Sequence, residues 1–247
     1  MTLEKYLENN LDIDNEKAKE IISLVNKYKK ENKKKINIKI PKYTLGEEIF
    51  NSISHGVGAL FSIVFLVLMV VKAKGALAET TVSLFGAAMI ILYTMSCIYH
   101  ALSSSLEGKK ILRVIDHCNV YLLVFGTYIP VALLGVGGIL GWILFGVVAS
   151  VTILGIVLTS IDIDNHQVLE VICHLINGWS ILFGISRLLN TMGLTGLLFL
   201  LIGGIMYTIG SILYGVGSKK KYMHCVFHVF CLLGTLFHFL GIYLYLL

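Results

Sequence analysis

The stretch that decides the fold is Gly141–Ser160, which reads GWILFGVVASVTILGIVLTS and contains no charged residue. A helix of this length rises by about 30 Å, which is the thickness of the hydrocarbon core of a bilayer. The stretch is apolar on every side, whereas a helix on the surface of a water-soluble protein keeps a polar face. We therefore expect residues 141–160 to span a membrane as a helix.

The rest of the chain repeats this pattern. The 247 residues are 56% hydrophobic and only 14% charged, whereas about a quarter of the residues of an ordinary soluble protein are charged. Six further stretches are long enough to cross a bilayer and almost free of charge. They are residues 50–71, 80–100, 114–133, 168–186, 194–217 and 224–247. The sequence therefore predicts an all-α integral membrane protein with seven transmembrane helices.

Lysine and arginine are distributed unevenly between the two sides of the predicted spans. Most lie in the leader, in the loop after the second span and in the loop after the sixth. Outside the leader these residues are Lys109, Lys110, Arg113, Lys219, Lys220 and Lys221. Loops rich in lysine and arginine stay in the cytoplasm, and acidic residues such as Asp162 and Asp164 weigh little in this rule. We therefore expect a multi-pass protein of the cell membrane with a cytoplasmic amino terminus and an extracellular carboxyl terminus.

Residues 1–42 differ in composition from the rest of the chain. Apolar residues recur there at helical spacing, and a lysine-rich run occupies residues 27–35. The apolar positions are Ala18, Ile21, Ile22, Val25 and Tyr28. This pattern predicts a cytosolic basic leader with a short amphipathic helix, held near anionic lipid headgroups. Nucleic-acid binding is disfavoured, because neither aromatic stacking residues nor a known nucleic-acid-binding fold accompanies the charge. Residues 43–247 are expected to form one membrane domain.

Ionisable residues are costly inside a bilayer, so each one is a functional candidate. His224 and His228 are four positions apart at the start of the seventh span, Ser96 and His100 are four apart at the end of the second, and Asp116 opens the third. Residues four apart lie on one helical face, about 6 Å from each other. Starts of odd-numbered spans and ends of even-numbered spans share one membrane face, whichever way the protein is inserted. These side chains are therefore expected to converge.

Three converging histidines indicate a metal site. Catalytic zinc takes three protein ligands and leaves one position open, so His100, His224 and His228 are the predicted ligands. Zinc lowers the pKa of a bound water to about 7, and the carboxylate of Asp116 is expected at the same membrane face. The competing interpretation is that each histidine forms hydrogen bonds in helix packing. Cys231 shares the face of the two seventh-span histidines and is a further candidate ligand, although packing is its simpler role.

Other polar residues in the spans form weaker patterns. Glu47, Asn51 and His55 repeat every four residues into the first span, where they would support the site. Three histidines are expected to lie outside the metal site. His117 is turned by about 100° from Asp116, and His238 lies about 15 Å along the helix from His228. His174, with Glu170 and Asn177, is expected to form a hydrogen-bond network between packed helices.

The combined pattern resembles the hemolysin III family, relatives of the progestin and adipoQ receptors. The motifs that carry the resemblance are Glu47-x-x-x-Asn51-x-x-x-His55, Ser96-x-x-x-His100, Asp116 and His224-x-x-x-His228. Residues 113–117 (RVIDH) and 126–130 (GTYIP) look like the bacterial branch, and the resemblance runs from about residue 43 to the end. It implies a seven-helix fold with a cytosolic amino terminus and a zinc ion on the three histidines. Asp116 would then hold the zinc-bound water, with Ser96 beside it.

Two hypotheses for the function follow. The wider superfamily includes alkaline ceramidases, so the resemblance implies a zinc-dependent hydrolase of a lipid amide or ester at the inner leaflet. Asp116 would act on the water, and Ser96 would donate a hydrogen bond to the developing oxyanion. The alternative is a non-enzymatic protein, either receptor-like, membrane-modulating or a pore-forming cytolysin. A pore needs a continuous polar path, and the third to sixth spans hold only scattered polar residues, which favours a cavity.

Overall fold

The computed structural model of the chain describes residues 14–32, 38–217 and 220–247, and all the regular secondary structure in them is helical. The chain divides into two compact units between Asn37 and Ile38. The first unit contains α2 (Asn15–Asn32), a helix where the sequence predicts one, with Ala18 buried. The predicted boundary between residues 42 and 43 is not tested by this division and stays a prediction.

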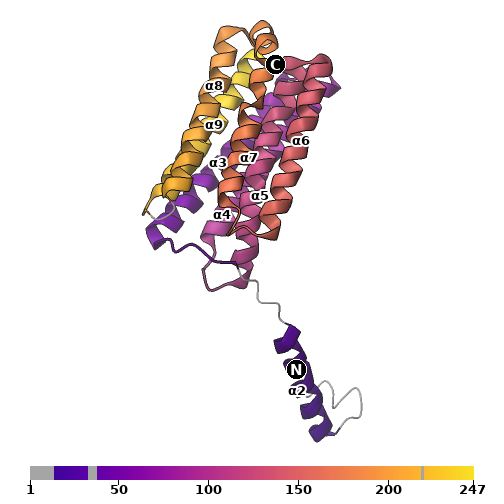
Figure 1. Cartoon of the computed structure of the whole chain (residues 1–247), viewed down its shortest axis with the longest axis vertical. Coiled ribbons are helices and arrows are strands. Elements are labelled where there is room, and N and C mark those ends of the chain that lie inside the picture. The colour runs from indigo at the N-terminus through magenta and orange to yellow at the C-terminus, as the bar shows by residue number, and fades with distance from the viewer. Residues whose placement is uncertain (1–13, 33–37, 218–219) are drawn as a thin grey trace. The chain divides into compact units, whose positions relative to one another are not determined.

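The second unit is a bundle of long apolar helices (Figure 1). Its α-helices are α3 (Leu45–Lys72), α4 (Ala76–Ala101), α5 (Glu107–Pro130), α6 (Gly138–Ile161), α7 (Gln167–Trp179), α8 (Ile185–Gly217) and α9 (Met223–Tyr245). Among the described residues, six helical segments are long and apolar enough to cross a membrane. The all-α membrane fold expected from the sequence is thereby confirmed.

The fifth and sixth predicted spans form one apolar segment of 48 residues, Val168–Gly215. It consists of α7, a short 3-10 helix η2 (Ser180–Gly184) and α8. At Gly193 the backbone leaves the helical region, with φ 67° and ψ 177°, a conformation that residues with a Cβ atom rarely adopt. Figure 1 shows the chain running along the bundle in α7 and returning in the later part of α8. A glycine-dependent bend therefore lets one continuous apolar segment form two antiparallel limbs.

The third predicted span continues past α5 into a π-helix, η1 (Val131–Val136). Pro130 stands at the junction, where its ring removes a backbone N–H from the helical hydrogen-bond ladder. Gly137, at φ 63°, then turns the chain into α6. Val131 lines a cavity between the helices. The irregular turn thus lies where the helix wall borders that cavity.

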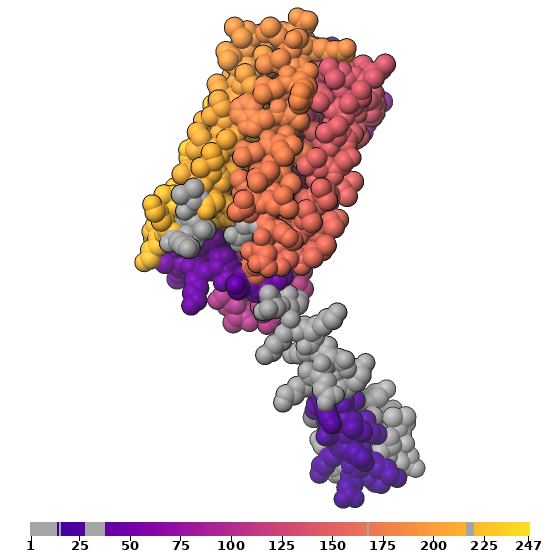
Figure 2. Space-filling model, viewed as in Figure 1, coloured from indigo at the N-terminus to yellow at the C-terminus, as the bar shows by residue number. Residues whose placement is uncertain are grey.

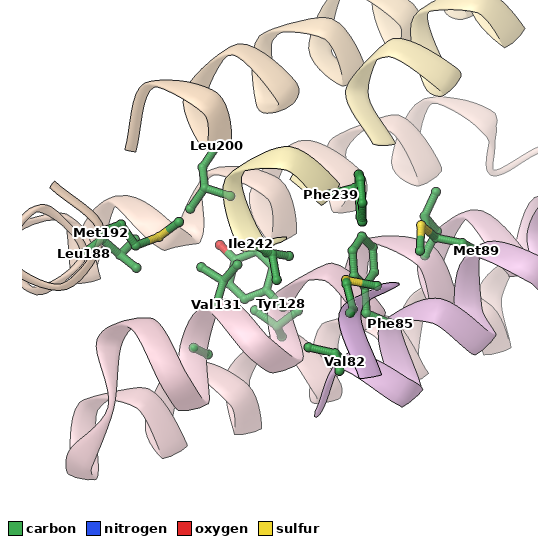
Figure 3. Close-up of a cluster of buried hydrophobic side chains, with 14 of the residues drawn as sticks. Val82, Phe85, Met89, Tyr128, Val131, Leu188, Met192, Leu200, Phe239 and Ile242 are labelled. Carbon is green, nitrogen blue, oxygen red and sulfur yellow. The ribbon is translucent and has the colours of Figure 1, made fainter. Parts of the chain in front are cut away.

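An apolar core joins the helices at the end of the bundle away from the histidines of α9. Figure 3 shows side chains from α4, α5, η1, α8 and α9 meeting there. The labelled members are Val82, Phe85, Met89, Tyr128, Val131, Leu188, Met192, Leu200, Phe239 and Ile242. The outer surface is also rich in exposed large apolar side chains, and α7 and α8, in orange, cover much of the face seen in Figure 2. Apolar residues inside and outside are what a bilayer requires.

Candidate metal centre

The side chains of three histidines meet at one end of the bundle. His224 Nε2 lies 3.3 Å from His100 Nε2 and 3.1 Å from His228 Nε2. One ligand nitrogen from each of the three residues falls within 4.8 Å of the others, and together they could hold a metal ion. His100 and His228 are buried, and His224 is partly buried. The three histidines therefore converge, as their positions at the ends of the predicted spans led us to expect.

Local structure explains why these nitrogens meet. His224 and His228 are one turn apart at the start of α9, and His100 is in the last turn of α4. Both helices pack against α3. Zinc–nitrogen distances of about 2.0–2.1 Å at a tetrahedral angle place two ligand nitrogens about 3.3 Å apart. The separations of 3.3 and 3.1 Å are close to this value, so the donor set fits zinc.

One ligand histidine is held by a carboxylate and a lysine. His100 Nδ1 lies 2.6 Å from Glu48 Oε2, and Lys109 donates a hydrogen bond of 2.5 Å to Glu48 Oε1. The lysine is almost fully buried and also donates to the carbonyl oxygen of Leu102. A histidine that donates its Nδ1–H to a carboxylate keeps Nε2 free as a metal ligand. Glu48 therefore orients His100 toward the other two histidines.

Asp116 and Ser96 both lie next to the three histidines. Both are buried, and both line the same cavity as His228, with a volume of about 100 Å³. From Asp116 the cavity follows α5 as far as Val131, which is about 22 Å along the helix. Its lining is mostly aliphatic and aromatic. A polar end with a carboxylate and a hydroxyl thus opens into a long, mostly apolar space.

The three polar residues predicted along the first span lie in different surroundings. His55 stacks on His228, with ring centroids 3.6 Å apart and planes within 10°. Asn51 is fully buried on the same face of α3. Glu47 instead forms a capping box with Thr44 and accepts a hydrogen bond of 2.6 Å from the backbone N–H of Tyr222. Glu47 therefore joins the start of α3 to the start of α9, and its neighbour Glu48 contacts His100.

A strap, residues 38–44, is fastened at the same end of the domain. Arg113, which is buried, donates hydrogen bonds of 2.6 Å to the Lys39 carbonyl oxygen and to Asp164 Oδ1. The Lys39 N–H also donates to Asp164 Oδ2 at 3.0 Å. Partial burial would raise the pKa of Asp164, but the Lys39 N–H and the Arg113 guanidinium outweigh it and hold that pKa below its ordinary value. The carboxylate is therefore charged at neutral pH.

Tyr43 in the strap covers the histidines. Its ring stacks on His224, with centroids 5.0 Å apart and planes 27° apart, and lies 5.6 Å from the His100 ring. Burial, with Tyr99 and Tyr214 nearby, raises the pKa of the Tyr43 hydroxyl well above its ordinary value, so the hydroxyl stays protonated. The strap thus places a neutral aromatic ring over the candidate metal centre.

The remaining histidines do not join this centre in the described residues. His117 Nδ1 lies 3.0 Å from Glu170 Oε1, which links α5 to α7. His238 Nε2 contacts the carbonyl oxygen of Leu200 at 3.1 Å. Cys231 lines the cavity but is outside the metal-binding group. Asn177 donates to Thr152 across α6 and α7, so part of the network predicted with His174 connects packed helices.

Glu48, Lys109 and Tyr43 were not singled out from the sequence. Glu48 adjoins Glu47, and the four-residue repeat with Asn51 favoured Glu47. Lys109 was counted as a loop charge, although it is buried. The only signal for Tyr43 was its place just before the first span. Residues three positions apart also share a helical face, and this rule would have added Glu48 to the stripe of Asn51 and His55.

Comparison with known proteins shows the family of the chain. The family model for haemolysin-III related proteins matches residues 43–239. Hemolysin-3 of Bacillus cereus is 32% identical over 204 residues, which cover 81% of this chain and 92% of that protein. A Hemolysin-3 homolog of Bacillus subtilis (strain 168) is 32% identical over 196 residues, covering 78% and 91% of the two chains. The chain therefore belongs to the haemolysin-III related family of multi-pass membrane proteins.

Proposed function

We propose that this protein is a zinc-dependent hydrolase of a lipid amide or ester, with its centre facing the inner leaflet. The observation that carries the proposal is the convergence of His100, His224 and His228 at the polar end of a long apolar cavity. Asp116 and Ser96 stand at that end, where a reacting carbonyl and a water would meet. The apolar lining would take an acyl chain and exclude bulk water.

The proposal includes an orientation in the membrane. The two limbs of Val168–Gly215 would each cross the bilayer, giving seven spans in all. The amino terminus and the histidines would then be cytoplasmic, and the carboxyl terminus extracellular. Lys109, Arg113, Lys220 and Lys221 lie at the histidine end and agree with the excess of basic residues on the cytoplasmic side.

Each part of the site would have a distinct task. When bound, zinc would polarise the carbonyl and lower the pKa of the attacking water. Asp116 would orient that water and accept its proton, and Ser96 would donate a hydrogen bond to the developing oxyanion. Water would add to the carbonyl carbon, the bond to the leaving nitrogen or oxygen would break, and the proton from Asp116 would pass to the leaving group.

Zinc content and lipid turnover test the proposal together. Purified protein should contain one zinc ion per chain and hydrolyse acyl amides or esters from a membrane lipid extract. Asp116→Asn should keep the zinc and lose turnover by about 10²-fold or more, because general-base catalysis contributes about 10²–10⁴-fold. Asp162→Asn, which changes a carboxylate in the loop between α6 and α7, is the matched control. Unchanged turnover in Asp116→Asn with zinc bound would rule out this catalytic role.

A second candidate is a pore-forming or otherwise membrane-modulating protein without catalysis, in line with the name Hemolysin-3 of the Bacillus cereus relative. Thr127, Thr208 and His238 also line the cavity away from the histidine end, but aliphatic and aromatic side chains form most of its lining. Such a cavity favours a lipid-binding site over a water-filled channel. Dye leakage from liposomes that contain the protein, at an equal rate with His100→Ala, would support the pore and separate it from the histidines.

A further inference from the structure

The start of α9 has an unusual backbone conformation. Tyr222, the residue at the N-cap of this helix, has φ 63° and ψ −1°, which is the left-handed conformation. Among the residues that the structure describes, it is the one residue other than glycine with a positive φ. This conformation is costly for a bulky residue and persists only where surrounding contacts hold it. The turn into α9 therefore needs a contact that stabilises it.

The side chain of Tyr222 does not supply this contact. It is 55% exposed, and the two residues before it, Lys220 and Lys221, are exposed as well. The side chain also makes no hydrogen bond that caps α9. Most helices instead begin with a short polar residue, such as serine or asparagine, in an extended conformation. The rest of the molecule therefore has to hold Tyr222 through its backbone.

Glu47 holds that backbone. Its Oε1 accepts the 2.6 Å hydrogen bond from the Tyr222 N–H, and its Oε2 accepts hydrogen bonds from the N–H and the hydroxyl of Thr44. Because Thr44 caps α3, one buried carboxylate serves the first turns of two helices, whose dipoles both favour a negative charge there. The Cys225 thiol also donates a weak hydrogen bond of 3.9 Å to the Glu47 carbonyl oxygen. Two contacts with Glu47 thus bracket His224 along the chain.

We propose that Glu47 is a positioning residue of the metal centre, which holds Tyr222 in the left-handed conformation and thereby fixes the rotation of α9. This rotation decides where the ligand nitrogens point, because His224 is in the first turn of α9 and His228 is one turn later. The inference rests on the zinc centre of the proposed function and adds the residue that aligns two of its ligands. The neighbouring Glu48 contacts the third ligand histidine. The first turn of α3 would thus align all three.

The zinc affinity of the purified full chain, measured by competition with a chelator, tests this role. Glu47→Ala should weaken zinc binding by about tenfold or more, which is the usual loss when a group that orients metal ligands is removed. Thr44→Ala is the matched control, because it removes the hydroxyl from the capping box of α3 and leaves the bond to Tyr222 in place. Its zinc affinity should stay near that of the wild type.

Substitutions at residue 222 test the same role with Glu47 intact. Glycine adopts a positive φ without steric cost, whereas a β-branched residue strongly disfavours it. Tyr222→Gly should therefore bind zinc at least as tightly as the wild type, and Tyr222→Val should bind it more weakly. Combining Tyr222→Gly with Glu47→Ala should restore most of the affinity that Glu47→Ala loses, because glycine no longer needs the carboxylate to hold the turn. The visible spectrum of the Co²⁺-loaded protein, which reports ligand geometry, should change in Glu47→Ala and return in the double variant.

The outcomes separate this inference from the proposed function. The inference is overturned if Glu47→Ala binds zinc as tightly as Thr44→Ala, if Tyr222→Gly and Tyr222→Val have the same affinity, or if the double variant stays as weak as Glu47→Ala. A wild-type protein that shows the predicted series of zinc affinities but hydrolyses no lipid would overturn the proposed function alone. A wild-type protein that binds no zinc would overturn both.

Discussion

The two ends of the membrane domain bury different kinds of side chain. At the end away from the α9 histidines, Met69, Val82, Phe239 and Ile242 lie in an apolar core where no polar partner is needed. At the histidine end, the buried residues include charged and polar groups. They include Glu47, His100, Lys109, Arg113, Asp116 and His228. Lipid tails are as apolar as leucine side chains, so the apolar end of the domain is stabilised by packing alone. At the histidine end, each buried polar group needs a hydrogen-bond partner, a counter-ion or a ligand.

This difference between the two ends indicates that the functional site lies at the histidine end. Some polar groups satisfy each other, as in the pairs of Glu48 with Lys109 and of Arg113 with Asp164. The Nε2 atoms of the histidines instead point at one another, and the Nδ1 atoms of His224 and His228 have no partner in the described residues. Groups of this kind are costly for folding alone. An ion held by the three Nε2 atoms would satisfy those atoms.

The largest expected effect comes from removing a ligand. His224→Ala should weaken zinc binding by roughly 300-fold or more, because each of three ligands supplies about a third of a binding free energy of at least about 10 kcal/mol. Competition with a chelator of known affinity measures this change. His166→Ala removes a histidine from the loop before α7 and should leave the affinity unchanged. Equal zinc binding by both variants would place the ion elsewhere.

A substitution in the apolar core should lower the stability of the fold and leave the zinc affinity unchanged. Phe239 is buried and stacks on Phe65 with ring centroids 3.9 Å apart. Phe239→Ala should lower the free energy of unfolding by about 3 kcal/mol through the cavity that it leaves. Its zinc affinity should not change, because residue 239 is about 16 Å along α9 from His228. Unfolding in detergent, with chelator competition on the folded protein, checks both statements. A matching loss of zinc affinity would contradict the separation of the two ends.

A smaller effect is expected from Glu48. Glu48→Gln should weaken zinc binding by about 10- to 100-fold, because a carboxylate that accepts from a ligand histidine fixes its orientation and raises its basicity. Glu107→Gln is the control for a lost surface carboxylate. Chelator competition again measures the affinity. If Glu48→Gln binds zinc as tightly as the control, then the hydrogen bond to His100 only packs the helices.

The smallest effect concerns the strap and depends on pH. The pKa of Asp164 is lowered in the folded protein, so its contribution to stability is complete above the ordinary carboxyl pKa of about 4 and is lost as the pH falls through the lowered value. Asp164→Asn should therefore speed hydrogen exchange of residues 38–44 at neutral pH. Acidification should release the wild-type strap and change the variant little. Exchange rates corrected for the intrinsic pH effect measure this, and equal acid sensitivity in both would refute it.

The sequence predicted the helices well because apolar runs as long as residues 141–160 have few alternatives to a membrane helix. It also predicted that His100 meets His224 and His228. The reason is that the starts of odd-numbered spans and the ends of even-numbered spans lie at the same membrane face, whatever the packing order of the helices. It could not show that two predicted spans form one segment bent at Gly193, since the bend depends on a single backbone conformation. Apolar content alone also does not reveal the π-helix after Pro130.

Side-chain partners were harder to predict than positions. Glu47 and Glu48 are adjacent and both acidic, and only the rotation of α3 decides that Glu48 meets His100 while Glu47 caps the helix. Residues 38–44 have no helical periodicity, so apart from the place of Tyr43 just before the first span nothing in the sequence indicated that the strap covers the histidines. The pairing of His117 with Glu170 joins α5 to α7, and such contacts depend on helix packing order, which parity does not supply.

The most direct test of a zinc centre is the zinc K-edge absorption spectrum of the purified wild-type protein. The account predicts one zinc ion per chain with three imidazole nitrogens and one oxygen at about 2.0–2.1 Å. His228→Ala should lose this spectrum. A protein that binds no zinc, or a spectrum dominated by sulfur at about 2.3 Å from Cys225 or Cys231, would contradict the account.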